Sequence, residues 1–101
     1  MVTEVTSMEA IRKGPVLLDF YTTTCGPCRA MHSIFEEISN EFAGVKVAQV
    51  EVTRNPEVSQ MFGIMSVPTV IFMQDCQVKE VIRGASTKKN LESMVKKHIG
   101  S

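Results

Sequence analysis

The sequence predicts an α/β domain in which a central mixed β-sheet, in the element order βαβαβαββα, carries helices on both faces. Three observations predict it: apolar runs of strand length, apolar stripes at helical spacing, and glycine, proline or capping residues between them. A strand–helix–strand unit followed by another helix and a terminal hairpin favours parallel central strands and antiparallel strands at the end. The architecture is therefore an α/β sandwich.

The first third of the chain predicts two strands around a brief helix. A strand over residues 2–5 precedes a helix that Thr6 and Glu9 open as a capping box. Residues 16–21 form a nearly unbroken apolar run, which is typical of a strand covered on both faces at the centre of a sheet. Asp19 is the anomaly in this run, because an unpaired carboxylate inside an apolar strand is costly. We expect Asp19 to be protonated or hydrogen-bonded, with burial raising its pKa.

The middle of the chain predicts the longest helix, a strand and a short helix. The long helix runs from Cys28 until Gly44, and residues 45–52 form the next strand. The short helix has Asn55 as its cap and a proline in its first turn. The apolar stripe of the long helix comprises Met31, Ile34, Phe35, Ile38 and Phe42. The expected buried side of the short helix comprises Val58, Met61 and Phe62.

The last third of the chain predicts a hairpin and a final helix. Two apolar segments, residues 69–73 and 78–83, flank a turn and should pair as antiparallel strands. The final helix is capped by Ser86 or Thr87 and ends at Gly100. Its apolar side comprises Leu91, Met94, Val95 and Ile99.

Length and charge limit the classes of function that the chain can have. The 101 residues fit one domain, residues 1–101, that builds its core without a partner chain, so we expect a monomer. Eleven basic and eleven acidic residues give no net charge and no long run of one sign, which gives no support to nucleic-acid binding. Neither a signal peptide nor a membrane span is visible, so a reducing cytoplasm is the expected compartment.

Cys25 and Cys28 lie between the central strand and the long helix. Residues three apart on a helical turn have Cα atoms roughly 5–6 Å apart, inside the range of about 4.4–6.8 Å that a disulfide tolerates. Cys25, at the cap position, faces free N–H groups and the positive end of the helix dipole, which favour the attacking thiolate. Cys28, one turn deeper, is placed to resolve a mixed disulfide. Gly26 lets a substrate backbone approach, and Pro27 limits flexibility.

The stretch from Asp19-Phe20-Tyr21 to Cys25-Gly26-Pro27-Cys28 resembles the active-site region of the thioredoxin family, and Val67-Pro68-Thr69 strengthens the likeness. The element order over nearly the whole chain is similar to the thioredoxin fold. The resemblance implies a thiol–disulfide oxidoreductase that reduces protein disulfides through Cys25 and Cys28, with a redox-active disulfide and no cofactor. It also implies two kinds of partner, disulfide-containing substrate proteins and a thioredoxin reductase that restores the dithiol.

The resemblance assigns a substrate groove as well. Pro68 is expected to follow a cis peptide bond and to stand beside the two sulfurs. The substrate chain would lie extended in an apolar groove and share backbone hydrogen bonds with it. One wall is expected from Val67, Gly84 and Ala85. The other wall is expected from three residues around the first cysteine: Thr24, Gly26 and Pro27.

The resemblance makes Asp19 a catalytic residue too, because a buried acid at this position exchanges protons with the inner cysteine in the family. The chain departs from the family pattern around it. Gln49 stands where many members place a lysine near the buried acid. Thr24 and Tyr21 stand where members commonly carry tryptophan, so the apolar lip beside the first cysteine is smaller. These departures bear on partner preference and on the charge near Asp19.

A zinc site is the first alternative for the cysteines. Cys25, Cys28 and His32 have spacings compatible with zinc ligands, and Cys76 is a conceivable fourth. However, a strand that begins at Pro68 advances about 3.3 Å per residue and so carries Cys76 over ~20 Å from the site. We therefore predict no metal, and we interpret Cys76 as an inert thiol or a secondary oxidation site.

The remaining histidines and methionines have structural interpretations. His32 and His98 are expected to be solvated. Methionine fills gaps in cores, and three methionines fall on predicted core stripes, at Met31, Met61 and Met94. Met65 lies beside the expected groove and could contact substrates.

Two other functions are compatible with the same fold. A non-catalytic binding module would dock a partner through the same groove without using the thiols. An oxidase or isomerase would use the same motif with a more oxidising couple.

Overall fold

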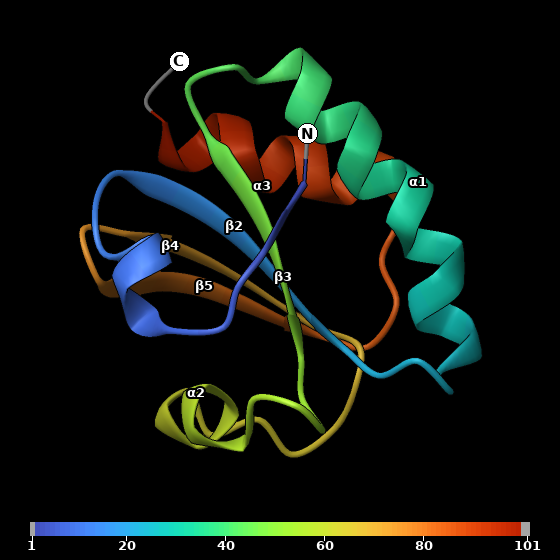
Figure 1. Ribbon diagram of the computed structural model, residues 1–101. Coiled ribbons are helices and arrows are strands. Elements are labelled where there is room, and N and C mark those ends of the chain that lie inside the picture. The colour runs from blue at the N-terminus through green and yellow to red at the C-terminus, as the bar shows by residue number, and fades with distance from the viewer. Residues whose placement is uncertain (1, 100–101) are drawn as a thin grey trace.

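The computed structural model describes residues 2–99, so the predicted helix end at Gly100 lies outside the described residues. Within them, five strands form one mixed sheet in the order β1–β3–β2–β4–β5 (Figure 1). The predicted element order βαβαβαββα is confirmed. The strands are β1 Thr3–Glu4, β2 Pro15–Tyr21, β3 Lys46–Glu51, β4 Thr69–Gln74 and β5 Gln77–Arg83.

The central strand β2 is bordered by one parallel and one antiparallel neighbour. It pairs with β3 in parallel and with β4 in antiparallel orientation, so that Asp19 lies in register with Gln49 on one side and Val70 on the other. On the outside, β1 runs parallel to β3 and β5 runs antiparallel to β4. The prediction that the apolar run over residues 16–21 is the central strand is confirmed, as is the terminal hairpin.

Helices cover both faces of the sheet. α1 (Gly26–Glu41) and α3 (Lys88–His98) lie on one face, and the 3₁₀ helix η1 (Met8–Ile11) and α2 (Pro56–Met61) lie on the other (Figure 1). Because side chains alternate along a strand, β2 contributes to a core on each side. The core under α1 and α3 includes Leu17, Phe35, Phe72 and Leu91. The core under η1 and α2 includes Ile11, Leu18, Phe20 and Val58.

The expected capping box at the first helix is wrong. The N-cap of η1 is Ser7, and no side chain caps this single 3₁₀ turn. Glu9 instead forms an ion pair with Arg12, with Oε1 2.7 Å from the guanidinium. Asn55 occupies the N-cap position of α2 but also makes no capping bond; its amide donates to the carbonyl of Glu51.

Two residues predicted to be buried on helix stripes are exposed. Met61 is 68% exposed and Ile99 is 39% exposed. α2 has six residues, so its stripe ends after one turn, and its buried positions are Val58 and Ser59. Ile99 is the C-cap of α3, beyond the last helical turn. Six other predicted core positions of α1 and α3 are buried: Met31, Phe35, Ile38, Leu91, Met94 and Val95. Ile34 and Phe42 on the α1 stripe are only partly buried.

His98 is also not solvated as expected. Its Nε2 lies 2.7 Å from Oε1 of Glu80, and its ring stacks on Phe72 with 5.1 Å between ring centroids. These contacts fasten the end of α3 to β5 and β4, and they leave the side chain 16% exposed.

The β4–β5 turn lies at the opposite end of β2 from the cysteine pair. Asp75 and Cys76 adopt the left-handed conformation there, with φ of +50° and +68°. The backbone of Asp75 donates to the carbonyl of Gly14 just before β2, whereas Cys25 follows the other end of that strand. Cys76 is therefore an exposed free cysteine remote from Cys25, as predicted.

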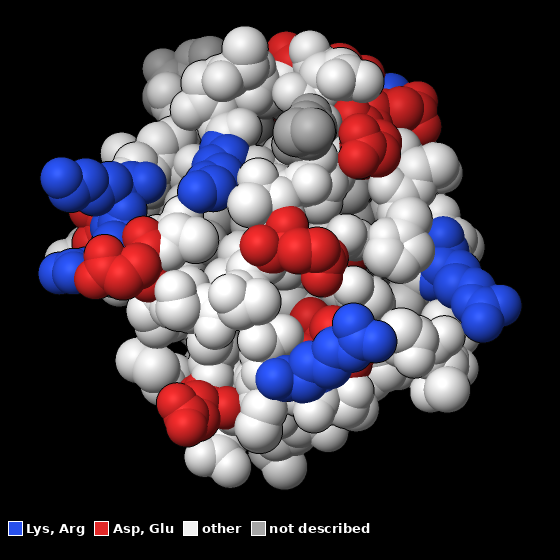
Figure 2. Space-filling view, in the orientation of Figure 1, with Lys and Arg blue, Asp and Glu red and all other residues white. Residues whose placement is uncertain are grey.

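Charges of both signs are interspersed on the face that Figure 2 shows. Among residues 2–99, no helix is both long and apolar enough to cross a bilayer.

Candidate active site

Cys25 occupies the N-cap position of α1, where the chain turns from β2 into the helix. Its backbone is extended, with φ −87° and ψ 112°, and its sulfur accepts a hydrogen bond from the backbone N–H of Cys28 at 3.1 Å. Proline in the first turn of α1 has no N–H to leave unpaired there. The predicted placement of Cys25 at the helix cap is confirmed.

Cys25 and Cys28 form a disulfide, with their Cα atoms 5.2 Å apart. The two sulfurs differ in access, because Cys25 is half-buried whereas Cys28 is fully buried inside the first turn of α1. The pair can therefore alternate between a dithiol and a disulfide, with one sulfur at the surface and one beneath it.

The Val67–Pro68 peptide bond is cis, as the resemblance implied. Pro68 is buried immediately before β4, and its carbonyl accepts a hydrogen bond from the backbone of Gly84 at 2.8 Å. Gly84 itself has φ +94°, a conformation that side-chain-bearing residues rarely adopt. The structure thus places Gly84 against the Val67–Pro68 segment.

The residues expected in the other wall surround Cys25. Thr24, Gly26 and Pro27 are all exposed, at the end of the β2–α1 loop and in the first turn of α1. A Cβ atom added to Gly26 would meet no atom within 4 Å, so the protein's own packing does not require glycine there.

Asp19 is completely buried on β2. Gln49 donates from Nε2 to Oδ2 of Asp19 at 3.2 Å, whereas Oδ1 has no hydrogen-bond partner among the described residues. Burial raises the pKa of Asp19 to about 7, the bond from Gln49 opposes that rise, and the charge of Glu4 adds to it. The expectation of a buried acid with a raised pKa is confirmed.

His32 is half-buried and contacts this buried pair, so the expectation that it is solvated is wrong. Its Nδ1 lies 2.6 Å from Nε2 of Gln49, and its ring meets the ring of Tyr21 edge-on with centroids 5.1 Å apart. The offset of four from Cys28 places both residues on the same face of α1. The spacing of four residues from Cys28 was the signal in the sequence that could have predicted this contact.

Tyr21 and Glu4 border the same group. The hydroxyl of Tyr21 donates to the carboxylate of Glu4 at 2.9 and 3.1 Å, and burial together with this carboxylate raises the pKa of Tyr21 to about 12. In the sheet, Glu4 is the register partner of Gln49. The polar group that His32 of α1 contacts therefore extends across β2, β3 and β1.

The sequence model of the thioredoxin family matches residues 2–97. The chain belongs to the thioredoxin family. It is 36% identical to a thioredoxin from Listeria monocytogenes serovar 1/2a over 97% of this chain and 96% of that protein. It is also 36% identical to thioredoxin 1 of a Nostoc species, over 84% of this chain and 80% of that protein. A mutant thioredoxin from Halobacterium salinarum superposes with a TM-score of 0.89 at 24% identity, covering 96% of this chain and 89% of that one, which supports the fold.

Membership in the thioredoxin family, together with the cysteine pair at disulfide distance, makes the chain a thiol–disulfide oxidoreductase. It acts as a protein disulfide reductase and redox carrier. Its redox-active group is the Cys25–Cys28 disulfide.

The zinc alternative finds no geometric support. In the part of the chain that the structure describes, no group of three or more His, Cys, Asp and Glu side chains could hold a metal ion. His32 contacts Gln49 and Tyr21, and Cys76 lies beyond the far end of β2.

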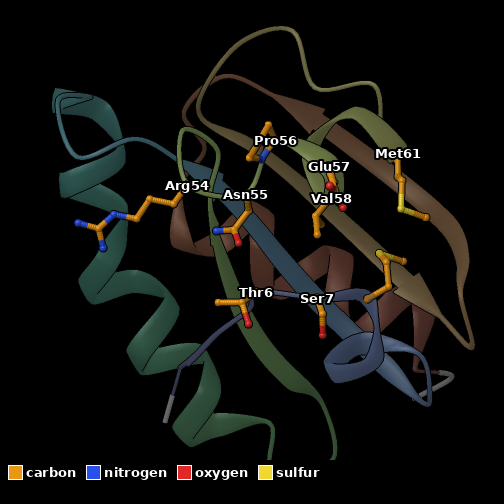
Figure 3. A pocket seen from close by; sticks show the side chains of 9 residues that line it. Thr6, Ser7, Arg54, Asn55, Pro56, Glu57, Val58 and Met61 are labelled. Atoms are coloured by element: carbon orange, nitrogen blue, oxygen red, sulfur yellow. The ribbon is translucent and has the colours of Figure 1, made fainter.

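A cavity of the thioredoxin-family domain lies on the η1 and α2 side of the sheet. Figure 3 shows that Thr6 and Ser7 border it from the loop after β1, and that Arg54 and Asn55 border it from the segment before α2. None of the residues assigned to the disulfide site lines this cavity.

Proposed function

We propose that Cys25 attacks substrate disulfides and that Cys28 resolves the mixed disulfide. One observation carries the proposal: Cys25 caps α1, and the backbone N–H of Cys28 points at its sulfur from 3.1 Å. This N–H and the positive end of the helix stabilise the thiolate, which is the nucleophilic form. Because Cys28 is fully buried, an approaching substrate meets Cys25 first.

The exchange transfers two electrons in two steps. The Cys25 thiolate attacks one sulfur of the substrate disulfide, and the other substrate sulfur leaves as a thiolate that takes up a proton. Cys28 then loses its proton and attacks the Cys25 sulfur, which releases the second substrate thiolate and leaves the Cys25–Cys28 disulfide. The substrate disulfide is reduced to two thiols, and the protein dithiol is oxidised.

Asp19 is proposed as the group that accepts the proton from Cys28. Its buried carboxyl has a pKa of about 7, so roughly half of the molecules hold it ionised at neutral pH. A carboxylate in that state can accept a thiol proton, and the acid can later return it. Asp19 reaches the helix through Gln49 and His32, and His32 lies one turn after Cys28.

The substrate chain is proposed to lie between the Val67–Pro68 segment with Gly84 and Ala85 on one side and the loop around Cys25 on the other. Backbone groups of Val67 and Gly84 would pair with an extended substrate segment. Open space over Gly26 leaves room for the approaching backbone. Thr24 and Pro27 would complete the wall around Cys25, and Met65, which is 96% exposed, would supply a flexible apolar contact beside the groove.

The proposed setting of the reaction is cytoplasmic. The chain would act as a monomeric thioredoxin domain over residues 1–101, without nucleic-acid or membrane partners. A thioredoxin reductase would return the disulfide to the dithiol, and disulfide-containing proteins would be its substrates.

Turnover of an accessible protein disulfide with a supplied reductant tests the proposal. Cys25→Ser should abolish turnover, and Cys28→Ser should retain substrates as mixed disulfides at Cys25. Unchanged turnover in Cys25→Ser would refute the assignment. If Cys25→Ser kept partner binding in cells while Val67→Asp abolished it, the domain would instead be a binding module.

A further inference from the structure

The amide of Gln49 has two neighbours, and both face its nitrogen. Nε2 lies 3.2 Å from Oδ2 of Asp19 and 2.6 Å from Nδ1 of His32. A primary amide nitrogen carries two hydrogens and no lone pair available for hydrogen bonding. In this orientation Nδ1 of His32 accepts one hydrogen while Asp19 accepts the other, which requires the imidazole tautomer with its proton on Nε2.

This arrangement fixes the amide from two sides. Gln49 is 8% exposed on β3, in register with Asp19 on β2, and His32 reaches it from α1. Rotating the amide by 180° would present its carbonyl oxygen to both neighbours. The carbonyl would suit a protonated Asp19 and a His32 tautomer that carries its proton on Nδ1, so the orientation of the amide and the tautomer of His32 are linked.

We propose that His32 is a positioning residue for Asp19: by accepting a hydrogen from Gln49, it holds the Gln49 amide as a donor to Asp19 and so favours the carboxylate. The inference rests on the proposed role of Asp19 as the proton acceptor for Cys28. It assigns to the pair Gln49 and His32 the task of keeping that carboxylate available at neutral pH.

The charged and titratable groups around Asp19 also affect whether its carboxyl group is ionised. From β1, Glu4 opposes ionisation of Asp19 by its charge, and that carboxylate is itself bound by Tyr21 of β2. From β4, the register partner is the apolar Val70. From α1, His32 contacts Gln49, and the buried Cys28 lies one turn before His32. Within the described residues, Gln49 is the one side chain that donates a hydrogen bond to Asp19, so its orientation matters directly.

Two variants of His32 distinguish the effect of its hydrogen-bond acceptor from the effect of its aromatic ring. His32→Phe keeps a ring against Tyr21 but removes the acceptor, whereas His32→Asn removes the ring but places a carbonyl oxygen near the position of Nδ1. The titration of the Asp19 carboxyl carbon, followed by NMR in the oxidised protein, is the readout. We expect His32→Phe to raise the proton affinity of Asp19 about threefold to tenfold, the range of one net hydrogen bond, and His32→Asn to stay near wild type.

A double variant tests whether His32 acts through Gln49. Gln49→Leu alone should raise the proton affinity of Asp19, and adding His32→Phe should then change it no further. Additive effects, or an unchanged Asp19 titration in His32→Phe, would overturn the proposal. A shift in His32→Asn without one in His32→Phe would also overturn it, since the ring would then be the cause.

The tautomer of His32 gives an independent readout in the unaltered protein. Nitrogen NMR of the neutral ring should find the proton on Nε2, and a proton on Nδ1 would contradict the proposal. None of these measurements uses disulfide turnover, so their failure is distinguishable from failure of the proposed function, which the Cys25→Ser variant tests. If both hold, His32→Phe should also shift the pH profile of mixed-disulfide resolution upward.

Discussion

The backbone N–H of Cys28 points at the sulfur of Cys25 across the first turn of α1, with 3.1 Å between nitrogen and sulfur. The two cysteines are thus coupled twice, once through their disulfide and once through this hydrogen bond. In the reduced protein the N–H remains with the helix, because it belongs to the backbone of α1. It therefore stabilises whatever negative charge the Cys25 sulfur carries.

The first prediction concerns the reactivity of this sulfur. In the reduced protein, Cys25 should react with iodoacetamide at pH 7 about tenfold faster than Cys76, because a thiol at a helix N-terminus is more ionised than an ordinary one. Cys76 is an internal reference, since it is exposed in a turn. Peptide mapping after timed alkylation measures both rates. Equal rates at the two sites would show that the helix cap does not activate Cys25.

The second prediction concerns the pH dependence of stability. The pKa of Asp19 is about 7 in the folded protein and 3.8 ordinarily, so between about pH 4 and pH 7 the folded state holds a proton that the unfolded state has lost. The free energy of unfolding should therefore fall as pH rises through this window. The difference between the two pKa values corresponds to on the order of 4 kcal/mol.

Asp19→Asn should remove most of this slope and make the protein more stable than wild type at pH 8. Urea unfolding of the oxidised protein at pH 5 and pH 8 measures the effect. Glu57→Gln, an exposed carboxyl-to-amide change in α2, is the matched control and should keep the wild-type slope. An equal slope in Asp19→Asn would mean that another group causes the pH dependence.

Much of the fold and of the disulfide site could be predicted because the signals are local in sequence. The apolar run over residues 16–21 identifies the central strand, and the spacing of Cys25 and Cys28 identifies an exchanging pair at a helix start. The position of Asp19 inside the run already required burial with a raised pKa. None of these inferences needs the relative placement of distant segments.

The contacts that could not be predicted depend on strand register and helix placement. Gln49 meets Asp19 because β3 pairs with β2 in one particular register, and a shift of one residue would turn Gln49 to the opposite face. His32 meets Gln49 only because α1 crosses this part of the sheet. The position of His32 outside the apolar stripe of α1 suggested a solvated histidine, whereas packing under α1 decided otherwise.

The third prediction compares two methionines that the sequence places on core stripes. Met31 is a buried residue of α1 and is 1% exposed, whereas Met61 at the end of α2 is 68% exposed. Met31→Ala should lower the free energy of unfolding by about 2–5 kcal/mol, as expected for loss of a buried side chain. Met61→Ala should change it by less than about 0.5 kcal/mol. Denaturant unfolding of both variants decides, and similar losses would place Met61 in the core after all.

The fourth prediction resolves which residue caps α3, since the sequence allows either Ser86 or Thr87. In the structure, Thr87 is the N-cap, and its hydroxyl accepts a hydrogen bond from the backbone of Asn90 at 3.1 Å. Thr87→Ala should therefore lower the free energy of unfolding by about 1 kcal/mol. Ser86→Ala removes a neighbouring hydroxyl that makes no capping bond, so it should change stability by only about 0.5 kcal/mol or less.

The cap at Thr87 matters for stability because α3 closes one of the two cores. Its buried residues Leu91, Met94 and Val95 pack in the same core as Phe35 and Phe72. A frayed first turn would loosen Leu91 first, since Leu91 donates its backbone N–H to the carbonyl of Thr87. Hydrogen exchange at the amides of Asn90 and Leu91 should therefore accelerate in Thr87→Ala and stay unchanged in Ser86→Ala. Faster exchange in Ser86→Ala instead would identify Ser86 as the cap in solution.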